Sequence, residues 1–193
     1  VGTTAFCARR RIPGHQVVIA QIDTGFMLDH PALQGRLVFD GIDLSGDGRA
    51  NAAYDTRQRG ATYWHATAVA SVLAGNTDEN VKILPYKVVR FGTDTCAASA
   101  VLAAMEDAVA KGARVLNMSL STSQNRAGFA AMMDKAAALG VAVCCSAGNA
   151  GEQISNRYPS ALPQAITVSA VTADKTVAGF SNYGDLVDYC APG

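Results

Sequence analysis

The chain has 193 residues, of which 49% are hydrophobic and 17% charged, a composition that predicts a globular domain with a sizeable core and excludes a disordered chain. The 16 basic and 16 acidic residues balance, so charge gives no reason to expect nucleic acid or an anionic membrane as a partner. No apolar run approaches the roughly 20 residues that a membrane-spanning helix needs. We expect Val1 to mark a processed or trimmed end, so a missing signal peptide does not exclude secretion.

Apolar runs alternate with helical patterns along the chain. In chain order, the sequence predicts a buried strand over 17–23, a loop over 41–61, a helix over 66–73 closed by Gly75, a strand over 81–89 with an irregularity at Pro85, a helix over 99–111 stopped by Gly112, a strand over 115–120, a helix over 128–139 stopped by Gly140, strands over 141–146 and 166–171, and another starting near 187–191. This alternation indicates βαβ units, and therefore one α/β domain over residues 1–193 with a mainly parallel sheet.

The five cysteines are an odd number, so at least one is unpaired or pairs outside this chain. Adjacent Cys144 and Cys145 would point to opposite faces of a strand, and we interpret them as small buried hydrophobic residues. A disulfide from Cys7 is open, and the sequence does not choose its partner.

Two polar segments directly follow predicted strands. Asp23 ends the strand over 17–23, before the turn residues Thr24 and Gly25, and Asn149 follows the strand over 141–146. Ligands of parallel sheets bind beyond the carboxyl ends of the strands, so both segments are candidates for a site. Taken singly, Asp23 and Asn149 are typical turn residues and His65 is a typical surface histidine. Only their combination, in this order, favours a catalytic role.

Five segments in this order resemble the subtilases, the family of subtilisin-like serine peptidases. They are Ile22-Asp-Thr-Gly25 with Asp29-His-Pro-Ala-Leu33, then His65-Ala-Thr-Ala-Val-Ala70, Leu116-Asn-Met-Ser-Leu120, Ser146-Ala-Gly-Asn149, and Phe180-Ser-Asn-Tyr-Gly184 through Ala191-Pro-Gly193. Together these segments span residues 17–193. The resemblance implies a three-layer α/β fold with a mainly parallel central sheet, incomplete at its C-terminal end, and the activity of a serine endopeptidase.

The resemblance also implies catalytic roles. Asp23 would hold the imidazole of His65 in the tautomer that accepts a serine proton, and Asn149 would donate an N–H to the oxyanion. Histidine suits the role of base because its pKa lies near neutrality.

A primary specificity pocket follows from the same resemblance. Ser119, Leu120 and Ser121 would form one wall of this pocket, and Ala147 and Gly148 another. The family usually has glycine where Ser121 stands, so we expect a narrowed pocket.

Other candidates have structural interpretations. His30 lies in a His-Pro turn, where we expect a structural role, and we assign no role to His15. Asp-Thr-Gly also marks aspartic proteases, which need two carboxylates that share a proton. No second such motif occurs here, and the surrounding pattern is α/β, so we set that class aside.

The Gly-Thr-Ser-Met-Ala motif that carries the nucleophile in this family is absent. We expect the serine on a missing downstream segment or on a second chain that binds this one, with a polypeptide as substrate; a truncated sequence is a further explanation. The alternative function is that of a non-catalytic binding module with the subtilase fold.

The resemblance bears on metals and location too. The loop between Gly75 and Val81 is short where many subtilases bind calcium, so we expect no metal and no cofactor, although Asp78, Glu79 and Asn80 offer oxygen ligands. A secreted or periplasmic location follows from the resemblance.

Overall fold

The computed structural model describes residues 16–54 and 64–193, which divide between two compact units, Val1–Arg114 and Val115–Gly193. The single domain over residues 1–193 stays a prediction. Within the described residues no helix is long and apolar enough to cross a bilayer. His15, Cys7 and the end of the predicted 41–61 loop lie outside the described residues.

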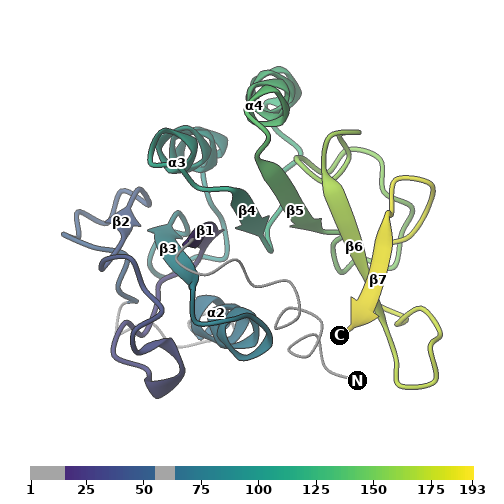
Figure 1. The fold of residues 1–193 in the computed structure, drawn as a ribbon. Coiled ribbons are helices and arrows are strands. Elements are labelled where there is room, and N and C mark those ends of the chain that lie inside the picture. Colours follow the sequence, from purple (N-terminus) through teal and green to yellow (C-terminus); the bar gives the residue numbers. More distant parts are fainter. Residues whose placement is uncertain (1–15, 55–63) are drawn as a thin grey trace. The chain divides into compact units, whose positions relative to one another are not determined.

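The first unit is built in three layers, with a helix on each face of a parallel sheet. Its elements are β1 (Val17–Asp23), η1 (Pro31–Leu33), β2 (Ile42–Asp43), α2 (His65–Asn76), β3 (Val81–Lys87) and α3 (Ala98–Ala110). Strand β3 lies between β1 and β2 and pairs with both in parallel. Helices α2 and α3 lie on opposite faces of β1 and β3 (Figure 1), and both contact β1.

Helix α2 packs through a stripe of small residues. Ala66, Ala70 and Ala74 recur every four positions and are buried against a cluster that includes Phe26 and Ile83. Because alanine side chains are short, the helix axis can approach the sheet closely. This packing fixes the first turn of α2 beside the carboxyl end of β1.

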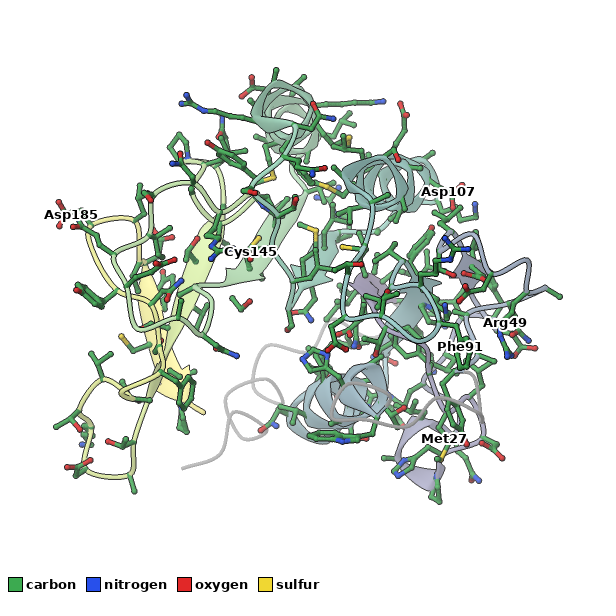
Figure 2. All side chains as sticks on the ribbon, turned by 180° about the vertical axis from the view of Figure 1, so that it is seen from behind. Met27, Arg49, Phe91, Asp107, Cys145 and Asp185 are labelled. Atoms are coloured by element: carbon green, nitrogen blue, oxygen red, sulfur yellow. The ribbon has the colours of Figure 1, made fainter. Side chains whose placement is uncertain are left out.

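Helix α3 is tied to the sheet by a polar contact as well as by apolar packing. Asp107 of α3, labelled in Figure 2, accepts a 2.7 Å hydrogen bond from the hydroxyl of Tyr86 on β3. Asp107 also pairs with Lys111 one turn further along the helix. The buried tyrosine thus reaches a charged partner at the edge of the core.

The second unit is a parallel sheet with one crossover helix. Its elements are β4 (Val115–Met118), α4 (Arg126–Ala138), β5 (Ala142–Ser146), β6 (Ile166–Val171) and β7 (Tyr189–Pro192). The strands pair in the order β4-β5-β6-β7, all parallel. Asn125 caps α4 by accepting the N–H of Gly128 at 3.2 Å, and Gly140, with a φ of +68°, follows its C-terminus.

Strand β5 carries the adjacent cysteines. Cys145, labelled in Figure 2, is buried, and Cys144 is half-buried on the opposite face. Burial raises the pKa of both thiols, so both are poor nucleophiles. The interpretation as buried hydrophobic residues therefore holds fully for Cys145 and partly for Cys144. These two cysteines, Cys96 and Cys190 are free thiols.

Three sequence predictions about elements need correction. The 41–61 segment is not all loop, because Ile42–Asp43 pairs with β3. Gly75 does not close α2, which continues to Asn76 because the guanidinium of Arg36 binds the carbonyl of Ala74 and the hydroxyl of Thr77. Pro85 does not interrupt β3. Its nitrogen cannot donate a hydrogen bond, but it lies on the β2 side of the strand, where only two residues of β3 are paired.

Candidate active site

The carboxylate of Asp23 and the imidazole of His65 form a direct hydrogen bond. Asp23 is the last residue of β1 and His65 the first of α2, and the distance from Nδ1 of His65 to Oδ1 of Asp23 is 2.7 Å. A carboxylate only accepts hydrogen bonds, so Nδ1 carries the proton and Nε2 is the basic nitrogen. The predicted contact between these side chains, at the carboxyl end of a parallel strand, is therefore confirmed.

The two partners differ in exposure. The side chain of Asp23 is 2% exposed and that of His65 is 36% exposed. A buried carboxylate thus faces one side of an imidazole that solvent reaches. The hydrogen bond that His65 donates to Asp23 raises the pKa of His65; partial burial of the ring opposes this rise, and the negative charge of Asp23 adds to it.

Backbone and side-chain contacts fix the start of α2 next to Asp23. Trp64, at the N-cap, makes no side-chain cap bond, but the hydroxyl of Thr24 accepts the N–H of Ala66 at 3.0 Å. The hydroxyl of Thr67 accepts the N–H of Met27, labelled in Figure 2, at 2.9 Å. Because orphan N–H groups at a helix start need acceptors, these bonds anchor the turn that carries His65 to the segment after β1.

Two further donors bind the carboxylate of Asp23. The backbone N–H of Thr24 donates to Oδ1 at 2.6 Å, and the side-chain amide of Gln21 donates to Oδ2 at 3.2 Å. Sequence reasoning missed Gln21, because it lies in an otherwise apolar strand. Its only sequence signal is one polar residue two positions before the aspartate, on the same face of β1.

In the second unit, Asn149 follows β5 in an exposed turn. The preceding Gly148 has a φ of +102°, a conformation that favours glycine, and a Cβ there would come within 2.6 Å of the amide nitrogen of Asn182. The turn therefore needs the glycine that the sequence provides. Asn149 lies, as predicted, beyond the carboxyl end of its strand.

Asn182 holds this turn, and sequence reasoning missed it. Its buried side chain accepts the N–H groups of Ala150 and Glu152 at 2.9 and 3.2 Å and donates to the carbonyl of Ala147 at 3.0 Å. Its signal was its place in the Phe180-Ser-Asn-Tyr-Gly184 segment, whose individual contacts the sequence does not reveal. One side chain thus fixes the backbone on both sides of Asn149.

The predicted pocket residues are likewise grouped at strand ends. Ser119, Leu120 and Ser121 follow β4, and Ala147 and Gly148 follow the neighbouring strand β5. All but the buried Ala147 are half-buried. Both segments therefore emerge at the same edge of the second unit's sheet.

His30 has the structural role that the sequence predicted. Its side chain caps η1, with Nδ1 accepting the N–H of Ala32 at 3.2 Å. His30 therefore takes no part in the pair formed by Asp23 and His65.

The short loop after α2 is organised by a side chain. Arg36 donates to the hydroxyl of Thr77 and to the carbonyls of Ala74, Asp78 and Val81. Across residues 16–54 and 64–193 no group of three or more His, Cys, Asp and Glu side chains could hold a metal ion. The predicted absence of calcium at this loop stays a prediction.

Similar proteins are known in both sequence and structure. "Subtilisin-like protease 2" of Trichophyton equinum is 29% identical over 180 residues, which cover 89% of this chain and 40% of the relative. "Halolysin" of Haloferax mediterranei is 32% identical over 188 residues, which cover 92% of this chain and 35% of the relative. The chain thus spans about two-fifths of the length of these curated relatives.

Solved structures of other proteins share the fold. A lanthipeptide protease superposes with a TM-score of 0.76 at 28% identity, covering 92% of this chain and 55% of that protein. A cold-adapted subtilisin-like serine proteinase superposes with a TM-score of 0.70 at 29% identity, covering 95% and 65%. The predicted subtilisin-like α/β fold is confirmed.

The family profile "Peptidase_S8: Subtilase family" matches residues 14–193, nearly the whole chain. The chain belongs to the subtilase family.

Proposed function

We propose that the protein is a serine endopeptidase that cleaves peptide bonds through an aspartate–histidine–serine triad. The observation that carries the proposal is the 2.7 Å hydrogen bond between Nδ1 of His65 and the buried carboxylate of Asp23. Such a pair has the geometry that a serine hydroxyl needs for activation, since a hydroxyl is a weak nucleophile until a base takes its proton. Subtilases in general are enzymes of this class.

His65 acts as the base and Asp23 as its orienting partner. With the Nδ1 proton held by Asp23, Nε2 accepts the proton of the serine and then passes it to the leaving amine. The imidazolium that forms between these steps is stabilised by the adjacent carboxylate. The raised pKa of His65 is consistent with this stabilisation.

Asn149 donates to the oxyanion that forms on the scissile carbonyl. Its exposed turn follows β5, and Asn182 fixes the backbone on both sides. A preorganised donor of this kind is effective because it needs no rearrangement as charge develops. Ser119, Leu120 and Ser121, with Ala147 and Gly148, line the pocket for the residue before the cleaved bond.

The nucleophilic serine comes from polypeptide outside residues 1–193, either the same chain or a second one. The sequence has no Gly-Thr-Ser-Met-Ala segment, and Ser181, in a different family segment, is 3% exposed. The composition of helix α2 favours a further segment that packs over it. Apart from His65 the helix has no ionisable residue, and its Val72 is 64% exposed. A helix that is apolar on most sides is normally covered by protein.

The proposal needs no cofactor and takes a polypeptide as substrate. In this proposal the side chains of Asp23, His65 and Asn149 supply the orienting carboxylate, the base and the oxyanion donor. We place the protein outside the cytoplasm, in the secreted or periplasmic compartment, on the strength of its family.

Peptide hydrolysis by the full protein and by residues 1–193 alone tests the proposal. We expect the full protein to cleave a peptide library and to be labelled at one serine by a serine-directed phosphonate, and residues 1–193 to show a severe loss of both. Restoration of labelling on adding the serine-bearing segment would support complementation. Labelling of residues 1–193 alone would show that the nucleophile lies within them. No labelling of the full protein would favour the non-catalytic binding module.

A further inference from the structure

Gln21 is a fully buried amide that contacts both Asp23 and the first turn of α2, the helix that begins at His65. It lies in β1, two residues before Asp23, so both side chains project from the same face of the strand. Its Nε2 donates to Oδ2 of Asp23 at 3.2 Å and to the carbonyl of Ala66, in the first turn of α2, at 2.8 Å. One amide group therefore contacts both the carboxylate and the residue next to His65.

The orientation of this amide is determined by its surroundings. Its two acceptors are a carboxylate oxygen and a carbonyl oxygen, so the opposite orientation would place three oxygens together. The oxygen Oε1 of Gln21 is buried and has no partner among the described residues. A buried oxygen without a hydrogen-bond partner destabilises the fold. An apolar side chain at position 21 would avoid this cost.

We propose that Gln21 is a positioning residue that acts on His65 through Asp23: its amide binds Oδ2 of Asp23 and thereby limits the negative charge that the carboxylate presents to the imidazole. The proposal rests on the function proposed above, because it gives Gln21 a role in the same reaction. A chain without protease activity could still show the effect of Gln21 on the pair.

Among the residues that the structure describes, few charged groups lie around His65. β1 contributes Asp23, whereas η1 and the rest of α2 contribute no ionisable side chain. His30, before η1, is engaged by the N–H of Ala32. Lys87, opposite Asp23 in the β1–β3 ladder, directs its ammonium to Asp47. Within residues 16–54 and 64–193, Asp23 is thus the charged group to which His65 responds.

Removing the amide of Gln21 should change the pKa of His65, and the direction of this change depends on the role of Gln21. Without this donor the carboxylate of Asp23 keeps more of its charge and basicity, so it stabilises the imidazolium more strongly and the pKa of His65 rises. If Gln21 were only a packing element, its loss would loosen the contact between Asp23 and His65. The pKa of His65 would then stay unchanged or fall toward its ordinary value.

An NMR titration of His65 in the full protein separates these cases. The sequence has three histidines, so the imidazole signals can be assigned by substitution. In Gln21→Met, which removes the amide but keeps an unbranched side chain, we expect the pKa of His65 to rise by about half a unit. The matched control is Gln164→Met, because Gln164 also donates its amide to an aspartate, Asp134, in the second unit. The control should leave His65 unchanged.

A second measurement needs no variant. In the unmodified protein, the side-chain amide signals of Gln21 should shift with the pH midpoint of His65, because Asp23 links the two groups. Amide signals that do not follow this titration, or a pKa of His65 that is unchanged or lower in Gln21→Met, would overturn the proposal.

Activity gives an independent readout. If the full protein hydrolyses peptides, the acid limb of its kcat/KM profile should move upward in Gln21→Met with the NMR pKa. If the full protein is inactive while the two NMR results hold, the proposed function fails and the role of Gln21 in the pair stands.

Discussion

Replacing Lys87 by methionine is expected to destabilise the first unit by a buried-charge effect. Its ammonium is fully buried and donates to Oδ2 of Asp47 at 2.6 Å, to the hydroxyl of Ser45 at 2.7 Å and to the carbonyl of Val89 at 2.6 Å. The carboxylate of Asp43, 1% exposed, lies 3.8 Å away. The ammonium therefore makes three hydrogen bonds, and its charge lies near two carboxylates, the buried one of Asp43 and the partly exposed one of Asp47.

The magnitude follows from what Lys87→Met would leave behind. Asp47, with an 11% exposed side chain, would lose its ion pair, and the buried carbonyl of Val89 would lose its donor. Removing one partner of a buried ion pair destabilises proteins by about 3–5 kcal/mol. Because Asp47 keeps some access to water and accepts the N–H of Phe91, we expect the lower end, about 3 kcal/mol at pH 7.

The loss of stability in Lys87→Met should be larger at neutral pH than at acidic pH. Burial alone would raise the pKa of Asp47, but hydrogen bonds from Lys87, Phe91 and Ser45 hold it below its usual value. This carboxylate therefore stabilises the native protein above its unfolded pKa of about 3.9, and the contribution is lost as pH falls through the lower native pKa. In Lys87→Met, burial dominates and the pKa of Asp47 rises. The variant therefore loses the most unfolding free energy, relative to the parent, at neutral pH.

Urea unfolding of the full protein at pH 7 and pH 4 measures both effects. The free-energy gap between the parent and Lys87→Met should narrow at pH 4. Lys82→Met is the matched control, since Lys82 lies on the same strand and its exposed ammonium donates to the carbonyl of Gly35. A gap no larger than that of the control, or one that does not change with pH, would refute the reasoning.

Three further predictions concern the site. Asp23→Asn should lower the NMR pKa of His65 and reduce kcat/KM of the full protein by about 10³- to 10⁴-fold, the magnitude typical of serine protease triads; an unchanged pKa would argue against the pair. Asn182→Ala removes three hydrogen bonds from the turn at Asn149, so thermal unfolding should show a loss of about 2–4 kcal/mol, and a loss below 1 kcal/mol would contradict the anchoring role. Ser121→Gly should broaden cleavage toward aromatic residues in a peptide library; an unchanged preference would mean that Ser121 points elsewhere.

Short sequence patterns were enough to predict several of the strands. The strand over 17–23 matches β1 and the strand over 166–171 matches β6, because short apolar runs there end at turn residues. The predicted meeting of Asp23 and His65 came from motif order rather than from periodicity. Each of these residues alone would have been interpreted as a turn or surface residue.

Contacts between distant segments could not be predicted. The ammonium of Lys87 meets a loop some 40 residues earlier in the chain, and Asn182 binds a turn some 30 residues before it. Gln21 was hidden because one polar residue in an apolar strand does not indicate its partners. In each case the side chain is buried by the tertiary fold, which brings donor and acceptor together only after the elements pack.

The central claim is that His65 is the base of a serine peptidase, and the rate of phosphonate labelling of the full protein as a function of pH tests it most directly. The account predicts that the second-order rate constant rises with one ionisation whose midpoint equals the NMR pKa of His65. It further predicts a fall of at least about 10³-fold in His65→Ala and parental rates in His30→Ala, which removes the η1 cap instead. Labelling that survives in His65→Ala with an unchanged pH profile would contradict the account.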